Sequence, residues 1–118
     1  MYYKQETGKE GEDIAVDYLK SIGYDVIERN FECRQGEIDI IALYKDEIVF
    51  VEVKTRRNIK YGLAAEAVND TKKKHFWKAV EYYLYSRNLQ DDFIRLDVIE
   101  VYLSKSKVYI NHIKKAIE

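Results

Sequence analysis

The sequence of 118 residues contains no proline, only five glycines and a single cysteine, Cys33. One cysteine excludes an intrachain disulfide and any metal cluster built on several thiolates. The scarcity of proline and glycine argues against linkers and disordered tails. No apolar run approaches the roughly 18 residues of a membrane-spanning helix, and the initial MYYKQETGKE lacks the apolar core of a secretion signal. We therefore expect a cytoplasmic protein that does not cross a membrane.

The charges are nearly balanced but unevenly distributed. The net charge is −1 at pH 7, which gives no global sign of nucleic-acid binding. Residues 54–78 carry eight basic side chains against two acidic ones, so this segment is basic and the remainder acidic. A local basic patch fits phosphate binding at one face. A solvated run of charges has the same composition, so both interpretations stay open.

The length predicts one domain, covering residues 1–118, with a substantial hydrophobic core. Hydrophobic periodicity predicts helices over residues 8–22 and 64–87, and strands over residues 24–31, 38–43, 48–53, 93–102 and 107–113. Thr7 and Glu10 form a capping-box pattern before the first helix, and Gly23 is placed to end it. The resulting order, αβββαββ, predicts an α/β fold in which helices pack on a mixed β-sheet.

The central stretch, residues 36–57, reads as a β-hairpin. A two-residue turn at positions 45 and 46 would place Asp39 opposite Glu52, and Glu37 opposite Lys54. A loop of odd length would shift this register. Acids that face each other destabilise a sheet, so the arrangement calls for a cation, and a divalent metal is the simplest candidate.

The two faces of this hairpin differ in character. One face is entirely apolar and is predicted to be buried: Ile38, Ile40, Ala42, Val49, Val51 and Val53. The other face is apolar near the turn and charged toward the open end, where Asp39, Glu52 and Lys54 share one side. The open end of the hairpin is therefore the candidate site.

The residues of this site suit phosphodiester chemistry. Asp39 and Glu52 could hold Mg²⁺ (or Mn²⁺ as a substitute), with the backbone carbonyl of Val53 as a further ligand. Lys54 could orient or deprotonate the attacking water, or stabilise the charged phosphate. Glu12 could add an oxygen, because Gly8, Gly11 and Ala15 would let its helix approach closely. Surface ion pairs and a favourable helix dipole are the simpler explanations of the same charges.

Two further charged residues occupy positions that look buried. Lys72 lies on the apolar stripe of the second predicted helix, where it could snorkel to the surface or point into the acidic site. Asp97 shares a strand face with apolar residues, which predicts a structural ion pair with Arg95 or Arg29. The two histidines, at positions 75 and 112, have no neighbours at zinc-ligand spacing, so a zinc site is not expected.

Several motifs together resemble those of the YraN-like family of small, uncharacterised bacterial proteins. In chain order they are GKEGEDIAVDYL, GYDVIERNF, GEIDIIA, IVFVEVKTR, GLAAEAVNDTKKK, EYYL, RLDVIEV and INHIKKAI. This family is similar to the restriction-endonuclease-like superfamily, and among its members to archaeal Holliday-junction resolvases. The implied fold is a restriction-endonuclease-like mixed sheet flanked by helices. Ile38 stands where the superfamily motif often has a proline before the acid.

The resemblance implies a metal-dependent nuclease site. Its acids fall on Asp39, Glu52 and Glu12, its catalytic lysine on Lys54, and its second-helix lysine on Lys72. The expected partner is nucleic acid, in particular branched or single-stranded DNA, and the basic positions for its backbone are Arg56, Arg57, Lys72 and Lys73. Junction resolvases act as dimers, so the resemblance also implies a homodimer. The alternative is a non-catalytic nucleic-acid-binding or protein-adaptor module that retains the fold.

Overall fold

The computed structural model describes the backbone of residues 2–57 and 70–116, and the side chains of residues 9–57 and 74–116. The elements are α1 (Tyr2–Ser21), β1 (Asp25–Cys33), β2 (Gly36–Tyr44), β3 (Glu47–Arg56), α2 (Asp70–Ser86), β4 (Phe93–Leu103) and β5 (Val108–Ile113). Their order is αβββαββ, as the sequence predicted. No helix within the described ranges is long and apolar enough to span a membrane.

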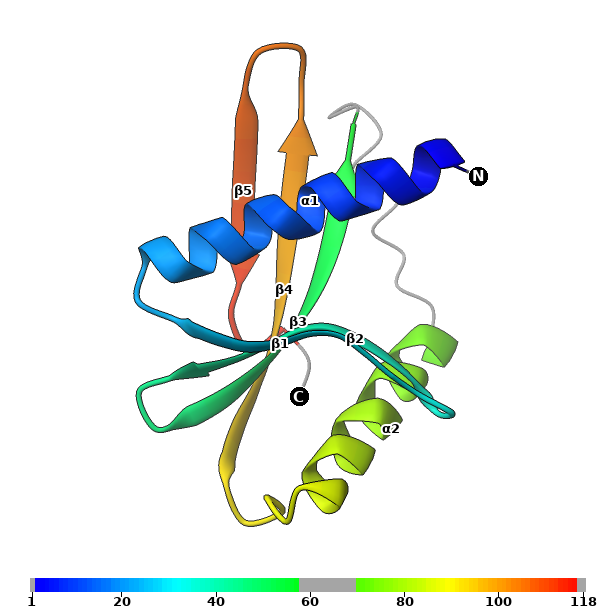
Figure 1. Cartoon of the computed structure of the whole chain (residues 1–118), viewed down its shortest axis with the longest axis vertical. Helices are drawn as coiled ribbons and strands as arrows, with labels where there is room; N and C mark the ends of the chain where they lie inside the picture. Colours follow the sequence, from blue (N-terminus) through cyan, green and yellow to red (C-terminus); the bar gives the residue numbers. More distant parts are fainter. Residues whose placement is uncertain (1, 58–69, 117–118) are drawn as a thin grey trace.

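The strands form one sheet in the order β1-β2-β3-β4-β5. Among the described strands only β3 and β4 pair in parallel, and α2 lies between them in the chain. Figure 1 shows α1 lying across β3, β4 and β5, and α2 beside the lower part of the sheet. The two helices pack into separate hydrophobic clusters, one on each face of the sheet. The predicted mixed sheet flanked by helices is therefore confirmed.

The register predicted for the β2–β3 hairpin is confirmed near the turn, where Tyr44 faces Glu47 and Ile40 faces Val51. Lys45 adopts the positive φ of 55° that this tight turn requires. Beyond Ile40, however, the described ladder between the two strands ends. From there β2 pairs only with β1, whereas β3 pairs with β4 as far as Arg56. The strands diverge, so the ladder pairs predicted further along are not formed.

This divergence corrects two expectations. Asp39 and Glu52 do not form a ladder pair, and Glu37 lies opposite Glu32 of β1 instead of Lys54. Ile38 also leaves the α1 side and packs in the cluster under α2. A Cβ on Gly36 would lie 2.6 Å from the carbonyl oxygen of His75, so the beginning of β2 rests directly on the α2 backbone. Packing of β2 against α2 thus takes precedence over its pairing with β3.

The first helix is longer than predicted, since α1 begins at Tyr2 and not at Gly8. The Thr7–Glu10 pattern therefore lies inside the helix, because residues 2–6 contain neither proline nor glycine to stop it earlier. The predicted end is confirmed: α1 stops at Ser21, and Gly23 takes a φ of 95°.

The packing of α1 depends on Gly11. A Cβ on this residue would lie 1.9 Å from the Thr55 Oγ1, so only glycine permits the observed approach of α1 to β3. The predicted close approach of this helix is therefore confirmed at Gly11.

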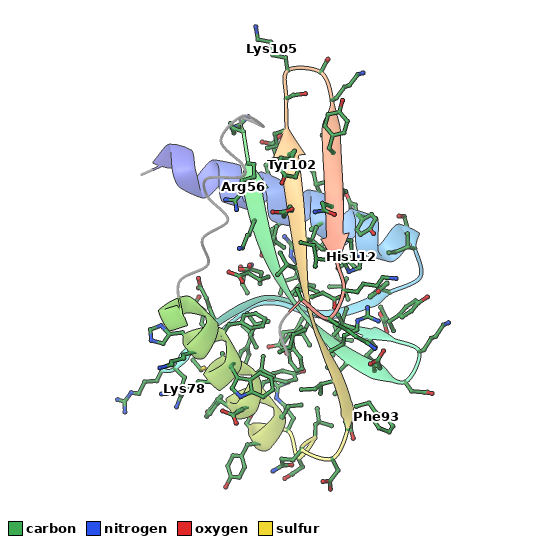
Figure 2. All side chains as sticks on the ribbon, turned by 180° about the vertical axis from the view of Figure 1, so that it is seen from behind. Arg56, Lys78, Phe93, Tyr102, Lys105 and His112 are labelled. Atoms are coloured by element: carbon green, nitrogen blue, oxygen red, sulfur yellow. The ribbon has the colours of Figure 1, made fainter. Side chains whose placement is uncertain are left out.

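The second helix is described from Asp70, so the part predicted over residues 64–69 lies outside the described residues. Its predicted apolar stripe is buried where the structure describes it, at Phe76, Ala79, Val80, Tyr83 and Leu84. Residues at the intervening positions are exposed, among them Lys74, Lys78 and Tyr85. Figure 2 shows Lys78 projecting from the helix away from the sheet.

Candidate functional site

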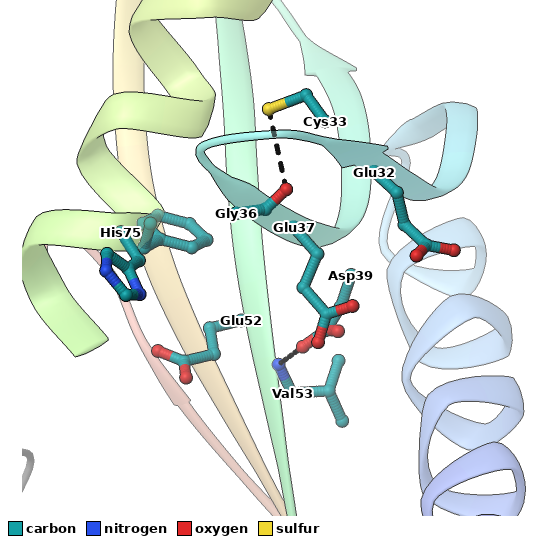
Figure 3. Close-up of a pocket in the computed structure, with 9 residues that line it drawn as sticks. Glu32, Cys33, Gly36, Glu37, Asp39, Glu52, Val53 and His75 are labelled. Atoms are coloured by element: carbon teal, nitrogen blue, oxygen red, sulfur yellow. Dashed lines mark hydrogen bonds between the residues drawn. The ribbon is translucent and has the colours of Figure 1, made fainter. Parts of the chain in front are cut away.

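An open cavity of about 530 Å³ lies where β2 and β3 diverge beside α2 (Figure 3). Its lining residues are Glu32, Cys33, Gly36, Glu37, Asp39, Glu52, Val53, His75 and Phe76. Four of these carry carboxyl groups, and none of the described lining residues is a lysine or an arginine. The cavity is therefore strongly acidic.

Asp39 lies half-buried at the point of divergence. Its Oδ2 accepts a hydrogen bond of 2.8 Å from the Val53 backbone N–H (Figure 3). In a continued ladder, a backbone carbonyl of β2 would accept the hydrogen bond from this N–H. Here the Asp39 carboxylate takes the place of that carbonyl. In an extended strand the N–H and C=O of one residue point toward the same neighbouring strand. The Val53 carbonyl consequently also points to the β2 side.

The electrostatic surroundings of Asp39 are unfavourable for its charge. Burial above all, and then the nearby negative charges of Glu12, Glu52 and Glu37, raise its pKa to about 6, although the Val53 hydrogen bond acts in the opposite direction. These acids come from α1, β2 and β3. Tertiary folding thus gathers carboxyl groups from three elements around one buried carboxylate, which favours a bound cation.

Glu12 reaches this region from α1 and is itself buried, with 7% of its surface exposed. Its Oε2 lies 3.3 Å from the Arg29 Nη2, and the same guanidinium lies 2.5 Å from Asp13 Oδ1. Glu12 does not line the cavity, but its negative charge raises the pKa of Asp39. The close contact of Gly11 with Thr55 holds this part of α1 against β3 and so fixes the position of Glu12.

Lys54 lies two residues beyond Glu52 on β3, on the same face of the strand. Its side chain is half-buried and its register partner in the parallel ladder is Glu100 of β4. Lys54 is not one of the described residues that line the acidic cavity. It therefore lies next to the carboxylates, farther along the open end of β3.

The donor groups fit a hard cation, although they are not preassembled. Among the described residues, no three histidine, cysteine, aspartate or glutamate side chains are arranged to hold a metal ion. Mg²⁺, however, is typically bound by only one or two carboxylates and retains several waters. Asp39, Glu52 and Val53 line one cavity, and the charge of Glu12 acts on Asp39 from α1. Oxygen donors of this kind could hold a hydrated Mg²⁺ ion.

The predicted nucleic-acid contacts are only partly described. Arg57 is exposed, and its Nη2 lies 3.1 Å from the Glu10 Oε1. Arg56 is half-buried near the end of β3, where Figure 2 labels it. Lys72 and Lys73 belong to the first turn of α2, but their side chains lie outside the described residues, so both predicted roles for Lys72 stay predictions.

A second polar cluster is structural. Asp97 is fully buried and accepts 3.0 Å hydrogen bonds from Arg95 Nε and Nη2, which decides between the two predicted partners. His112 Nε2 lies 2.7 Å from the same carboxylate, a contact that the sequence analysis missed. The register could have indicated it, because His112 faces Ile99 and Asp97 is the next residue on that face. His75 and Glu32, in the acidic cavity, were also missed because no sequence pattern joins them.

The five-stranded mixed sheet, flanked by helices in the order αβββαββ, defines a mixed α/β fold. Residues 11–101 match the model of a family described as uncharacterised protein family UPF0102, and the chain belongs to this family. The resemblance to the YraN-like family is thereby confirmed.

Similar proteins match over nearly the whole chain. A UPF0102 protein of Caldicellulosiruptor saccharolyticus is 46% identical over 115 residues, covering 96% of this chain and 98% of the relative. A UPF0102 protein of Clostridioides difficile is 48% identical over 112 residues, covering 95% of this chain and 96% of the relative. A crystal structure of SSO0001 is similar with a TM-score of 0.35 and 17% identity, covering 94% of this chain. This chain spans about half of that protein, 51% of its length.

Proposed function

We propose that the protein is a Mg²⁺-dependent endonuclease that hydrolyses phosphodiester bonds in DNA. The observation that carries the proposal is the meeting of Asp39 and Glu52 at an open acidic cavity, with Glu12 of a third element within electrostatic reach of Asp39. Such a cavity repels the phosphates of a nucleic acid unless a cation is bound. The same residues are those that the family resemblance implies for a nuclease.

Asp39, Glu52, the Val53 carbonyl and Glu12 would hold the ion, which when bound would activate water and neutralise charge on the phosphate. Asp39 must be ionised to act as a ligand, so its raised pKa makes proton and metal compete for it. Lys54, on the face of β3 that carries Glu52, would orient the attacking water or stabilise the developing phosphate charge.

The rim of the site would hold the DNA backbone. Arg56 and Arg57 follow Lys54 at the end of β3, and Lys72 and Lys73 lie in the first turn of α2. Contacts of this kind fix the position of the substrate without reading its sequence. Branched and single-stranded DNA are the candidate substrates.

The test is cleavage of single-stranded, duplex, flap and four-way-junction DNA in the presence of Mg²⁺ or Mn²⁺. We expect Asp39→Ala and Lys54→Ala to lose cleavage by at least about 100-fold, the scale of losing one general catalytic group. Asp46 is an exposed acid in the β2–β3 turn, so Asp46→Asn is the matched control and should cleave DNA at the unaltered rate. If the unaltered protein cuts no substrate faster than these two site variants, the proposal is wrong.

A second candidate is a non-catalytic nucleic-acid-binding or adaptor module. It is favoured by the ion pair of Glu12 with Arg29, which engages one of the supposed ligands. Such a module would bind DNA in a strongly salt-dependent way, unchanged by Asp39→Ala. Calorimetric titration with Mn²⁺ separates the two: a nuclease site binds the ion and loses it in Glu52→Ala, whereas the module shows no such binding.

A further inference from the structure

A second cavity, of about 550 Å³, adjoins the acidic one. Its lining residues are Phe31, Glu32, Cys33, Arg34, Gln35, Tyr82, Ser86 and Arg87. Glu32 and Cys33 line both cavities, so the end of β1 forms a shared wall. The two cavities therefore lie next to each other along the end of β1.

The chemistry of this second cavity differs from that of the first. It contains two arginines, Arg34 and Arg87, an amide side chain, Gln35, two aromatic rings and a single carboxyl group, whereas the acidic cavity has four carboxyl groups. Guanidinium groups bind phosphate, and an amide can hydrogen-bond to the edge of a base. The lining thus provides groups for the phosphate and for the base of a nucleotide.

The aromatic side chains give the cavity a stacking surface. Tyr82 is 44% exposed although it is a large ring, and its centroid lies 6.3 Å from that of Phe31. Arg87, which also lines the cavity, is held by two contacts. Its Nη1 lies 3.2 Å from Glu28 Oε1, and its guanidinium lies 4.6 Å from the Tyr83 ring centroid. The contact with Phe31 restrains the Tyr82 ring before any ligand arrives, which reduces the entropic cost of stacking.

We propose that this cavity binds one unpaired nucleotide of the DNA, with its base stacked on Tyr82 and its phosphate near Arg34. The inference rests on the proposed nuclease function, since it places the neighbouring phosphate of the same strand over the acidic cavity. A base within a duplex is stacked on both faces, so only a single-stranded or extruded nucleotide can stack on a side chain. The cavity volume lies within the usual range for small-molecule sites, about 300–1,000 Å³.

The test measures binding of a fluorescein-labelled oligo-thymidylate and of a labelled duplex to the full chain by fluorescence anisotropy. Mn²⁺ is present, and every protein carries Lys54→Ala so that cleavage is suppressed. We expect Tyr82→Ala to weaken oligo-thymidylate binding by about 10-fold, as for the loss of one stacked base, and to leave duplex binding unchanged. Tyr82→Phe keeps the ring and should bind like the unaltered protein. Tyr85→Ala is the matched control, because Tyr85 is 71% exposed on the same helix but does not line the cavity.

The outcomes separate this inference from the proposed function. Absence of cleavage by the unaltered protein, together with loss of oligo-thymidylate binding in Tyr82→Ala alone, would reject the nuclease but retain the nucleotide site. Normal oligo-thymidylate binding by Tyr82→Ala would overturn the nucleotide site even if the protein cuts DNA. Equal losses in Tyr82→Ala and Tyr85→Ala would also overturn it, because they would indicate a general helix surface.

Discussion

The Asp39 carboxylate accepts a 2.8 Å hydrogen bond from the backbone N–H of Val53, just beyond the last ladder pair between β2 and β3. At this point a side chain replaces a backbone acceptor, and the strands separate to form the acidic cavity. The same contact brings Asp39 next to the backbone of the Glu52–Lys54 segment. The site therefore originates in a local failure of strand pairing.

The first prediction concerns the pH dependence of stability. Burial raises the pKa of Asp39 from 3.8 to about 6, so the folded state binds this proton more tightly than the unfolded state. Stability should therefore fall as the pH rises from about 4 to about 6. We expect Asp39→Asn, which retains an acceptor for Val53, to increase the free energy of unfolding by about 2–3 kcal/mol at pH 8. At pH 4 the gain should nearly vanish.

Urea denaturation at both pH values, in EDTA, measures this difference. Asp46→Asn, in the exposed hairpin turn, should change the free energy of unfolding by less than about 0.5 kcal/mol. An equal gain from Asp39→Asn at pH 4 and pH 8 would mean that the charge of Asp39 is not the source of the effect.

The second prediction concerns metal binding without reference to activity. Mn²⁺ at 100 times its dissociation constant should stabilise the unaltered protein by about 2.7 kcal/mol at pH 7.5. Protons compete for Asp39, so the stabilisation should decline below pH 6. Thermal unfolding with and without Mn²⁺ measures it. Asp39→Asn and Glu52→Gln should abolish the shift in unfolding temperature caused by Mn²⁺. Glu81 is an exposed acid on α2, so Glu81→Gln should retain the shift. A shift that survives in Glu52→Gln would place the ion elsewhere.

The third prediction concerns the buried pair of Asp97 and Arg95. Burial raises the pKa of Asp97, but hydrogen bonds from His112, Arg95 and the Lys115 backbone more than offset this, so the pKa is lowered overall. The ion pair should therefore stabilise the fold above about pH 4 and lose its effect at lower pH. We expect Asp97→Asn to cost about 3–5 kcal/mol of unfolding free energy at pH 7, because it removes the buried charge partner of Arg95 and leaves only the more exposed Glu47, 3.4 Å from its Nη1.

A double-mutant cycle tests the origin of this loss. Combining Asp97→Asn with Arg95→Met should cost less than the sum of the two single changes, since the double variant removes the buried cation that has lost its buried partner. Additive losses would show that the two side chains do not act as a pair. Asp92→Asn, at an exposed position before β4, provides the reference.

The fourth prediction concerns the packing of α1 on β3. Gly11→Ala should normally stabilise a helix by up to about 1 kcal/mol. Here the new Cβ would lie 1.9 Å from Thr55 Oγ1, so we expect a loss of about 1–3 kcal/mol in the free energy of unfolding. Thr55→Ala removes that hydroxyl and should recover part of the loss in the double variant, as measured by chemical denaturation. A stabilised Gly11→Ala protein would show that α1 can move away from β3 freely.

Much of the fold could be predicted because it depends on local patterns. The alternation of apolar residues around Ile40 and Val51 gave the register of the hairpin, and the short turn at Lys45 fixed it. The apolar stripe of α2 was predicted equally well from its helical spacing. The predicted start of α1 was wrong because a capping pattern also occurs within helices, and residues 2–6 contain neither proline nor glycine to end the helix earlier.

The sequence by itself determined the order of elements, the family, and the acids Asp39 and Glu52 as candidates for one site. Only the tertiary structure decided that β2 leaves β3 after Ile40, since that depends on the contact of Gly36 with the backbone of α2. It likewise brought Glu12 within electrostatic reach of Asp39 and placed His112 against Asp97. Periodicity specifies which face a residue occupies, whereas contacts between distant elements depend on how whole faces pack, and no local pattern encodes that.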